Sequence, residues 1–138
     1  FYHYLLGQIF SDSQDFKSAL NNFALASELV KQPAPFLHMR LAELRLRAGE
    51  LETALAECEK ALQSDPENQK IMLLRAGILD SLERSDEAIP LYRKLIEKNP
   101  GLSAPYLLLS TSYLRRKEAA KAIEVLEELN KRYPNDPT

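Results

Sequence analysis

The chain has 138 residues and a mass of 15.7 kDa, a length typical of one domain. Its 18 basic and 20 acidic side chains leave a net charge of −2, which argues against the basic surface of a nucleic-acid-binding domain. Only 11 residues are Val, Ile or Thr, which argues against a sheet protein, and no apolar run approaches the roughly 18 residues that a membrane-spanning helix needs.

Eight helical segments follow one another along the chain, separated by turn signals. Gly49 comes directly after a Leu-rich run and predicts a helix C-cap, because glycine adopts the left-handed conformation at little cost. Ser103, with Pro105 in the first turn, predicts the start of the seventh helix. We expect the helices at residues 1–11, 15–30, 35–48, 51–64, 68–82, 85–98, 103–116 and 119–132.

A period of 34 residues relates these segments. Three prolines, each closing a second helix, are 34 residues apart: Pro66, Pro100 and Pro134. The alanines at the same interval are Ala54, Ala88 and Ala122, while Ala19 precedes Ala54 by 35 residues, which places one extra residue in the linker around Pro33. A small residue lies twelve positions before each alanine, where it would let paired helices approach closely: Gly7, Ala42, Ala76 and Ser110.

This pattern resembles the tetratricopeptide repeat, in four copies at about 1–33, 35–68, 69–102 and 103–136. The copies are degenerate, since the family's first-position Trp is replaced by His3, His38, Met72 and Tyr106. The resemblance implies an all-α fold, a right-handed superhelix (α-solenoid) of four helix-turn-helix repeats with eight antiparallel helices in one domain over 1–138. Because the chain starts at Phe1 with no signal sequence, we expect a fragment of a longer protein, with a slight preference for the cytoplasm.

No catalytic, cofactor-binding or metal-binding set is expected. The four glycines are scattered and match no phosphate-binding loop, and a single cysteine excludes an intrachain disulfide. His3 and His38 stand at packing positions, and a metal or acid–base role would need partners at ligand spacing. Cys58 is expected to be a small core residue. The acidic residues expected mostly on a solvated helical face are Glu50, Glu52, Glu57 and Glu59.

Charged residues leave two questions open. Arg45 and Arg75 occupy positions that are apolar in the family, either with the head of the side chain in water or in an ion pair whose partner the sequence does not name. Residues 1–69 carry 6 basic and 10 acidic side chains, net −4, and residues 70–138 carry 12 and 10, net +2. This asymmetry either orients a partner or reflects ordinary solvated faces.

A partner-binding groove is the main functional implication of the resemblance, because the first helix of each repeat lines the concave side of such arrays. The ligand-facing positions of the family on these first helices include Asp80. The apolar residues at such positions suit an amphipathic helix or an extended peptide. The cationic cluster that some members use to bind terminal carboxylates is missing, since only Lys70 fits it. The predicted groove residues are Tyr4, Gln8, Phe36, Met39, Glu43, Leu46, Arg47, Lys70, Leu73, Leu107, Thr111, Leu114 and Arg115.

The leading hypothesis is a non-catalytic protein–protein interaction scaffold that binds a peptide or helix of a partner, with no nucleic acid and no membrane insertion. A second hypothesis is a structural module that associates with its own copies through the groove or an uncapped end, and a third is a fragment of an enzyme whose catalytic domain lies elsewhere. Only four residues follow Pro134, so Ile123 and Leu126 should be partly uncovered. We expect either that the array continues in a longer protein or that this segment associates end to end. The apolar stripe predicted for the last helix is Ala119, Ala122, Ile123, Leu126 and Leu129.

Overall fold

The computed structural model describes residues 1–12, 15–31 and 34–134, so Pro33 and the four residues after Pro134 lie outside the described residues. The described residues form eight α-helices and no strand, and each helix begins and ends within one residue of its predicted position. The helices are α1 (Tyr2–Asp12), α2 (Phe16–Leu29), α3 (Pro35–Arg47), α4 (Leu51–Ser64), α5 (Gln69–Ser81), α6 (Ser85–Lys98), α7 (Ser103–Arg115) and α8 (Ala119–Arg132).

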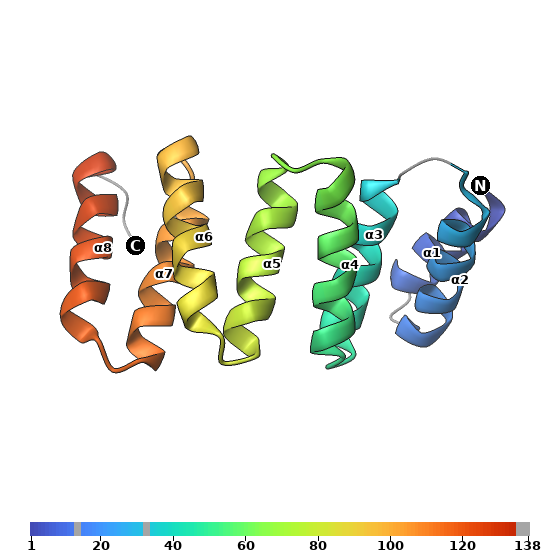
Figure 1. The fold of residues 1–138 in the computed structure, drawn as a ribbon, viewed down its shortest axis with the longest axis horizontal. Helices are drawn as coiled ribbons and strands as arrows, with labels where there is room; N and C mark the ends of the chain where they lie inside the picture. Colours follow the sequence, from blue (N-terminus) through green and yellow to red (C-terminus); the bar gives the residue numbers. More distant parts are fainter. Residues whose placement is uncertain (13–14, 32–33, 135–138) are drawn as a thin grey trace. The chain divides into compact units, whose positions relative to one another are not determined.

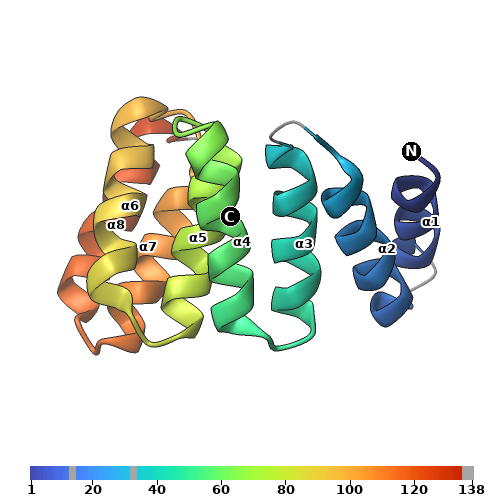
Figure 2. The same cartoon turned by 45° about the vertical axis from the view of Figure 1, so that its right-hand side comes forward.

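Two compact units make up the chain, Phe1–Ile78 and Leu79–Thr138, with their boundary inside α5. In the first unit α1 packs against α2 and α3 against α4, and in the second α7 packs against α8, as the repeat pattern predicts (Figure 1). At two places the first helix of a repeat also packs against the second helix of the preceding repeat. This second contact joins α2 to α3, which Figure 2 shows side by side, and α6 to α7.

The turns within repeats two, three and four share one left-handed residue. Gly49, Glu83 and Lys117 are 34 residues apart and have φ angles of 79°, 61° and 61°. Gly49 therefore fulfils its predicted role after α3, and it adopts this conformation without a Cβ clash. Glu83 and Lys117 adopt it with a side chain, which costs about 1 kcal/mol each.

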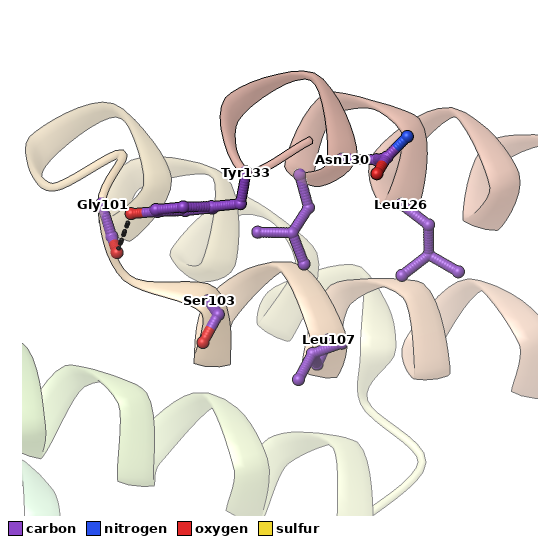
Figure 3. Close-up of a pocket in the computed structure, with 7 residues that line it drawn as sticks. Gly101, Ser103, Leu107, Leu126, Asn130 and Tyr133 are labelled. Carbon is purple, nitrogen blue, oxygen red and sulfur yellow. Dashed lines mark hydrogen bonds between the residues drawn. The ribbon is translucent and has the colours of Figure 1, made fainter. Parts of the chain in front are cut away.

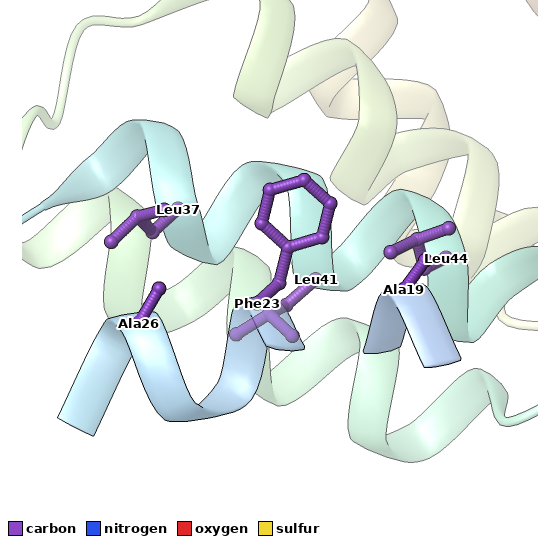
Figure 4. Close-up of a cluster of buried hydrophobic side chains, with 6 residues drawn as sticks. All are labelled: Ala19, Phe23, Ala26, Leu37, Leu41 and Leu44. Carbon is purple, nitrogen blue, oxygen red and sulfur yellow. The ribbon is translucent and has the colours of Figure 1, made fainter. Parts of the chain in front are cut away.

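Close packing between α1, α2 and α3 forms the core at the start of the chain. Ala19, Phe23 and Ala26 of α2 lie against α3, where they meet Leu37, Leu41 and Leu44 (Figure 4). A Cβ placed on Gly7 would come within 2.9 Å of the Phe23 ring, so only glycine allows this approach of α1 to α2. The equivalent small residues Ala42, Ala76 and Ser110 are also buried, which confirms the predicted contact positions.

The prediction that one apolar stripe of α8 faces inward is partly wrong. The structure buries Ala122 and Val125 and half-buries Leu129, whereas Ala119, Ile123 and Leu126 are exposed. Contact with α7 covers a narrow arc centred on Val125, and the neighbouring positions of the stripe fall outside it. The separate expectation that Ile123 and Leu126 are partly uncovered is confirmed.

Candidate partner-binding surface

Residues of α1 and α3 that were predicted to face a ligand contact one another in the first unit. The ring centroids of Tyr4 and Phe36 are 5.8 Å apart. The side-chain oxygen of Gln8 accepts a hydrogen bond from Arg40 Nη2 at 3.0 Å, and Arg40 Nη1 donates to Glu43 Oε2 at 2.9 Å. These five residues, Tyr4, Gln8, Phe36, Arg40 and Glu43, are called the α1–α3 face below.

The α1–α3 face combines an accessible aromatic ring, that of Phe36, with the ion pair of Arg40 and Glu43. Phe36 is 49% exposed, yet its neighbour Tyr4 is held by an edge contact with the buried Phe23 ring, at 5.6 Å between centroids. The Arg40 charge is balanced by Glu43 three residues later on the same helix. Arg40 was not among the predicted groove residues, although its spacing of three residues from Glu43 was a usable signal.

The other predicted groove residues of the first unit differ in their exposure to solvent. Met39, Leu46 and Leu73 are half-buried, and Lys70 is exposed. Arg47 is exposed, but its guanidinium lies over the Phe16 ring of α2, 5.5 Å from the ring centroid.

In the second unit the predicted residues of α7 form an exposed stripe. Leu107, Thr111 and Leu114 are spaced four and three residues apart, which places them on one face of the helix. Leu107 and Leu114 are exposed, with 55% of Leu114 accessible, and the Thr111 hydroxyl is satisfied by the Leu107 carbonyl at 2.9 Å. Arg115 is also exposed and donates to the backbone oxygen of Asp80 at 3.4 Å. We call Leu107, Thr111 and Leu114 the α7 stripe.

A pocket of about 700 Å³ lies between the start of α7 and the end of α8 (Figure 3). Two of its lining residues are joined by a hydrogen bond, which the Tyr133 hydroxyl donates to the Gly101 carbonyl at 2.7 Å. Leu107 belongs both to this pocket and to the α7 stripe. The α7–α8 pocket is lined by Gly101, Ser103, Leu107, Leu126, Leu129, Asn130 and Tyr133.

Asp80, which the repeat pattern placed among the ligand-facing positions, is buried instead. Its Oδ1 accepts hydrogen bonds from the Ser85 and Ser112 hydroxyls, both at 2.8 Å, and its Oδ2 accepts from Tyr92 at 3.1 Å. Burial, together with the neighbouring Asp80 charge, raises the pKa of the Tyr92 phenol. Three hydroxyl donors, two on α6 and one on α7, compensate the buried carboxylate, and no local sequence pattern predicts such a cluster.

Glu57 corrects a second prediction, because it is buried rather than on a solvated face. Its Oε2 lies 2.7 Å from His38 Nδ1, and its Oε1 lies 3.9 Å from Arg45 Nε. Arg45 also pairs with Glu50 at 2.7 Å. The half-buried His38 is therefore a packing residue tied to a carboxylate, and Arg45 is in an ion-pair network between α3 and α4.

Arg75 and Cys58 occupy neighbouring positions of α5 and α4. Arg75 Nη2 lies 3.8 Å from an oxygen of the exposed Glu59, so the ion pair of Arg75 is at the surface, whereas Arg45 pairs with the buried Glu57. Cys58 is fully buried, as predicted, and burial raises the pKa of its thiol to about 12. A thiol with such a pKa is a poor nucleophile at neutral pH.

Among the described His, Cys, Asp and Glu residues, no three lie close enough together to hold a metal ion. None of the described helices combines the length and apolarity that crossing a membrane requires.

Comparison with known proteins agrees with the repeat pattern. Two family models described as tetratricopeptide repeat match residues 4–69 and 39–103, and residues 81–138. YrrB, a tetratricopeptide repeat protein described as having an unusual peptide-binding site, is 18% identical over 96% of this chain and 68% of its own, with a TM-score of 0.85. MamA from Desulfovibrio magneticus RS-1 is 17% identical over 98% and 76%, with a TM-score of 0.86.

A tetratricopeptide repeat protein from Parabacteroides merdae is 20% identical over 98% of this chain, with a TM-score of 0.85. The chain spans 54% of that protein's length. At these identities the structural likeness is a likeness of fold.

Proposed function

The chain belongs to the tetratricopeptide repeat family, and from that premise we propose that it binds helical or extended segments of partner proteins, through the α1–α3 face of the first unit and, separately, through the α7 stripe of the second. The fold is an all-α solenoid of helix-turn-helix repeats, a protein-interaction scaffold. Members of the family are generally non-catalytic, and the proposal assigns no chemistry to this chain.

The exposed apolar side chains on the first helices carry this proposal. Phe36 and Leu114 are each about half exposed, although each lies on a helix that buries several other apolar residues. Large apolar side chains displayed in this way are the usual anchors of protein interfaces, because burying them against a partner removes apolar surface from water.

The arrangement also indicates which partner segments fit. On α7 the exposed leucines are seven residues apart, so they suit an amphipathic partner helix with apolar residues at matching spacing. On the α1–α3 face the Phe36 ring stands beside the Arg40–Glu43 pair, so an apolar residue flanked by polar groups would find both kinds of contact. The described peptide-binding site of YrrB, a protein of similar fold, is consistent with a peptide ligand.

Selection from a phage-displayed library of random peptides tests the proposal directly. Peptides enriched on the wild-type chain should share spaced apolar residues, and their affinity for Phe36→Asp or Leu114→Asp should fall by about thirtyfold or more, as for loss of an interface anchor. Leu25→Asp is the matched control, because Leu25 is a 43% exposed leucine on α2 at a position where later repeats carry Lys60, Lys94 and Glu128.

Both anchor variants should keep the helical spectrum and thermal stability of the wild type, since they alter exposed positions. Failure to enrich any peptide, or enriched peptides that bind both anchor variants as tightly as the wild type, would contradict the proposal.

A second candidate function is association between copies of this chain, through the groove or through exposed apolar side chains of α1 and α8. The observation that favours it is the exposure of Ile123 and Leu126 on α8 and of Tyr2 and Ile9 on α1. Sedimentation of the purified chain over a wide concentration range tests this candidate, which predicts a rising average mass.

A further inference from the structure

The second unit contains a polar pocket that the predicted groove residues do not account for. Its volume is about 700 Å³. Its lining comes from the end of α5, the turn that follows, the start of α6 and the end of α7 with the residue after it. We call it the α5–α7 pocket, and it is lined by Asp80, Ser81, Glu83, Ser85, Arg115 and Arg116.

An aromatic ring fills the equivalent place in the first unit. There Arg47, at the end of α3, lies over the ring of Phe16, at the start of α2, with 5.5 Å between the guanidinium carbon and the ring centroid. Arg115 and Ser85 stand at the equivalent positions two repeats later, and α6 packs against α7 as α2 packs against α3. Both residues line the α5–α7 pocket. Open space and a small hydroxyl side chain therefore stand where the first unit has a ring.

The hydrogen bonds of Asp80 belong to the same difference between the units. Its three hydroxyl donors occupy positions whose equivalents in the first unit are apolar and belong to one packed cluster. The equivalent pairs are Phe16 and Ser85, Phe23 and Tyr92, and Leu44 and Ser112. Because Ser85 donates to the buried Asp80 carboxylate at 2.8 Å, its side chain is held at the wall of the pocket.

Two opposite charges in the pocket are almost unused within the described chain. The side chain of Arg115 makes one hydrogen bond to the described residues, to the Asp80 carbonyl at a long 3.4 Å, and the Glu83 side chain makes none. Arg116, by contrast, forms ion pairs with two acidic side chains. Backbone geometry gives no reason for a glutamate at position 83, because its φ of 61° favours glycine, which repeat two has as Gly49.

We infer that the α5–α7 pocket receives a tyrosine side chain of the partner segment, with its ring against the Arg115 guanidinium and its hydroxyl donating to the Glu83 carboxylate. The ring contact repeats the one that Arg47 makes with Phe16 inside the chain. The hydroxyl gives the unpaired carboxylate a donor, and a phenol combines an apolar ring with such a donor. The inference rests on the proposed function, since Arg115 lies four residues after Thr111 and continues the α7 stripe.

An acidic partner group is the competing ligand for Arg115. It would meet the guanidinium, but it would also approach the carboxylates of Asp80 and Glu83, which line the same pocket. Repulsion between like charges makes an acid the poorer ligand, whereas a neutral phenol avoids that cost.

Titration of the isotopically labelled 138-residue chain with N-acetyltyrosinamide, followed by amide chemical shifts, tests the pocket without a partner. The signals of Ser81, Ser85 and Arg115 should move at millimolar concentrations of this small probe. N-acetylleucinamide should bind about fivefold more weakly, because it has no ring for the arginine. N-acetylphenylalaninamide, which has the ring without the hydroxyl, should lie between them, and the amide of N-acetylglutamate should bind more weakly than the tyrosine probe.

Variants of the lining residues identify the contacts. Ser85→Phe rebuilds the ring of the first unit and should abolish binding, whereas the control Ser85→Ala loses the same hydrogen bond to Asp80, leaves the pocket open and should bind the probe. Glu83→Lys keeps the turn, because Lys117 adopts the same conformation, and should remove the preference for tyrosine over phenylalanine. Arg115→Gln changes an exposed position and should remove the preference for phenylalanine over leucine. Circular dichroism of each variant checks the fold.

The outcomes separate this inference from the proposed function. Absence of shifts with the tyrosine probe, equal binding of the leucine probe, or full binding to Ser85→Phe overturns the inference, while peptides that lose affinity for Leu114→Asp still support the proposed function. Tighter binding of the glutamate probe also overturns it, in favour of an acidic ligand. If the tyrosine probe binds but the peptides that require Leu114 carry no tyrosine, the assignment to the partner segment is overturned. If no peptide is enriched, the proposed function and the inference fall together.

Discussion

Removing the carboxylate of Asp80 should destabilise the chain far more than a change at a typical surface acid. The side chain is buried and accepts three hydroxyl hydrogen bonds, two of them from the fully buried Ser112 and Tyr92. Asp80→Ala leaves those two hydroxyls without their acceptor, and each loss costs about 1–3 kcal/mol. We therefore expect the free energy of unfolding to fall by about 4 kcal/mol.

Urea unfolding followed by circular dichroism measures this loss, and a double-mutant cycle locates it. Tyr92→Phe should cost about 2 kcal/mol alone and much less in the Asp80→Ala background, because the hydrogen bond is then already gone. A loss below about 0.5 kcal/mol for Asp80→Ala, which is the range of ordinary surface changes, would refute the reasoning.

The raised pKa of Tyr92 adds a pH dependence with a definite sign. In the folded chain the phenol keeps its proton to a higher pH than in the unfolded chain, where the pKa is about 10. The stability that this difference contributes is complete below pH about 10 and is lost as the pH rises further. Tyr92→Phe should flatten the decline, and an unchanged decline would contradict the assignment.

Three further results should follow from the structure. Cys58 should react with a thiol reagent slowly when folded and quickly in denaturant, and Cys58→Ala should cost on the order of 1 kcal/mol in urea unfolding; rapid labelling of the native chain would disprove its burial. Lys117→Gly should raise the melting temperature by relieving about 1 kcal/mol of left-handed strain, while Gly49→Ala should lower it, and equal melting temperatures would argue against strain. Glu57→Ala should lower the free energy of unfolding by about 2 kcal/mol because it removes the partner of His38, whereas the exposed Glu59→Ala should cost under about 0.5 kcal/mol; equal losses would contradict the burial of Glu57.

The repeat period carried most of the fold prediction, because each 34-residue copy supplies the same punctuation. Prolines after second helices and alanines at the contact positions fixed the helix bounds to within one residue. The close approach at Gly7 could be foreseen for the same reason, since a small residue recurs at that position in every copy. The period is found by comparing the four repeats, so it predicts the features that the repeats have in common.

Features that differ between the repeats could not be predicted from the repeat period. Glu57 reads as one acid among several on a charged helix, and its burial depends on His38 from another helix. Asp80 sits at a nominally ligand-facing position, and its burial depends on hydroxyls 5, 12 and 32 residues away. Such polar clusters are set by tertiary contacts and not by local spacing.

Helix α8 shows the same limit at an apolar position. Val125 is buried, although the stripe predicted for α8 did not include it, while the expected partial exposure of Leu126 is confirmed. The contact with α7 decides which face of α8 is covered, and the spacing within α8 does not show it. The predicted groove residues are similar, since spacing places them on first helices and says nothing of what they bind.

Amide chemical-shift mapping of the isotopically labelled chain, with an enriched peptide added stepwise, tests the central claim most directly. The account predicts shift changes concentrated on the first helices, around Phe36 and the α1–α3 face and along Leu107, Thr111 and Leu114 of α7. Shift changes confined to the second helices α2, α4, α6 and α8, with those residues unmoved, would contradict it.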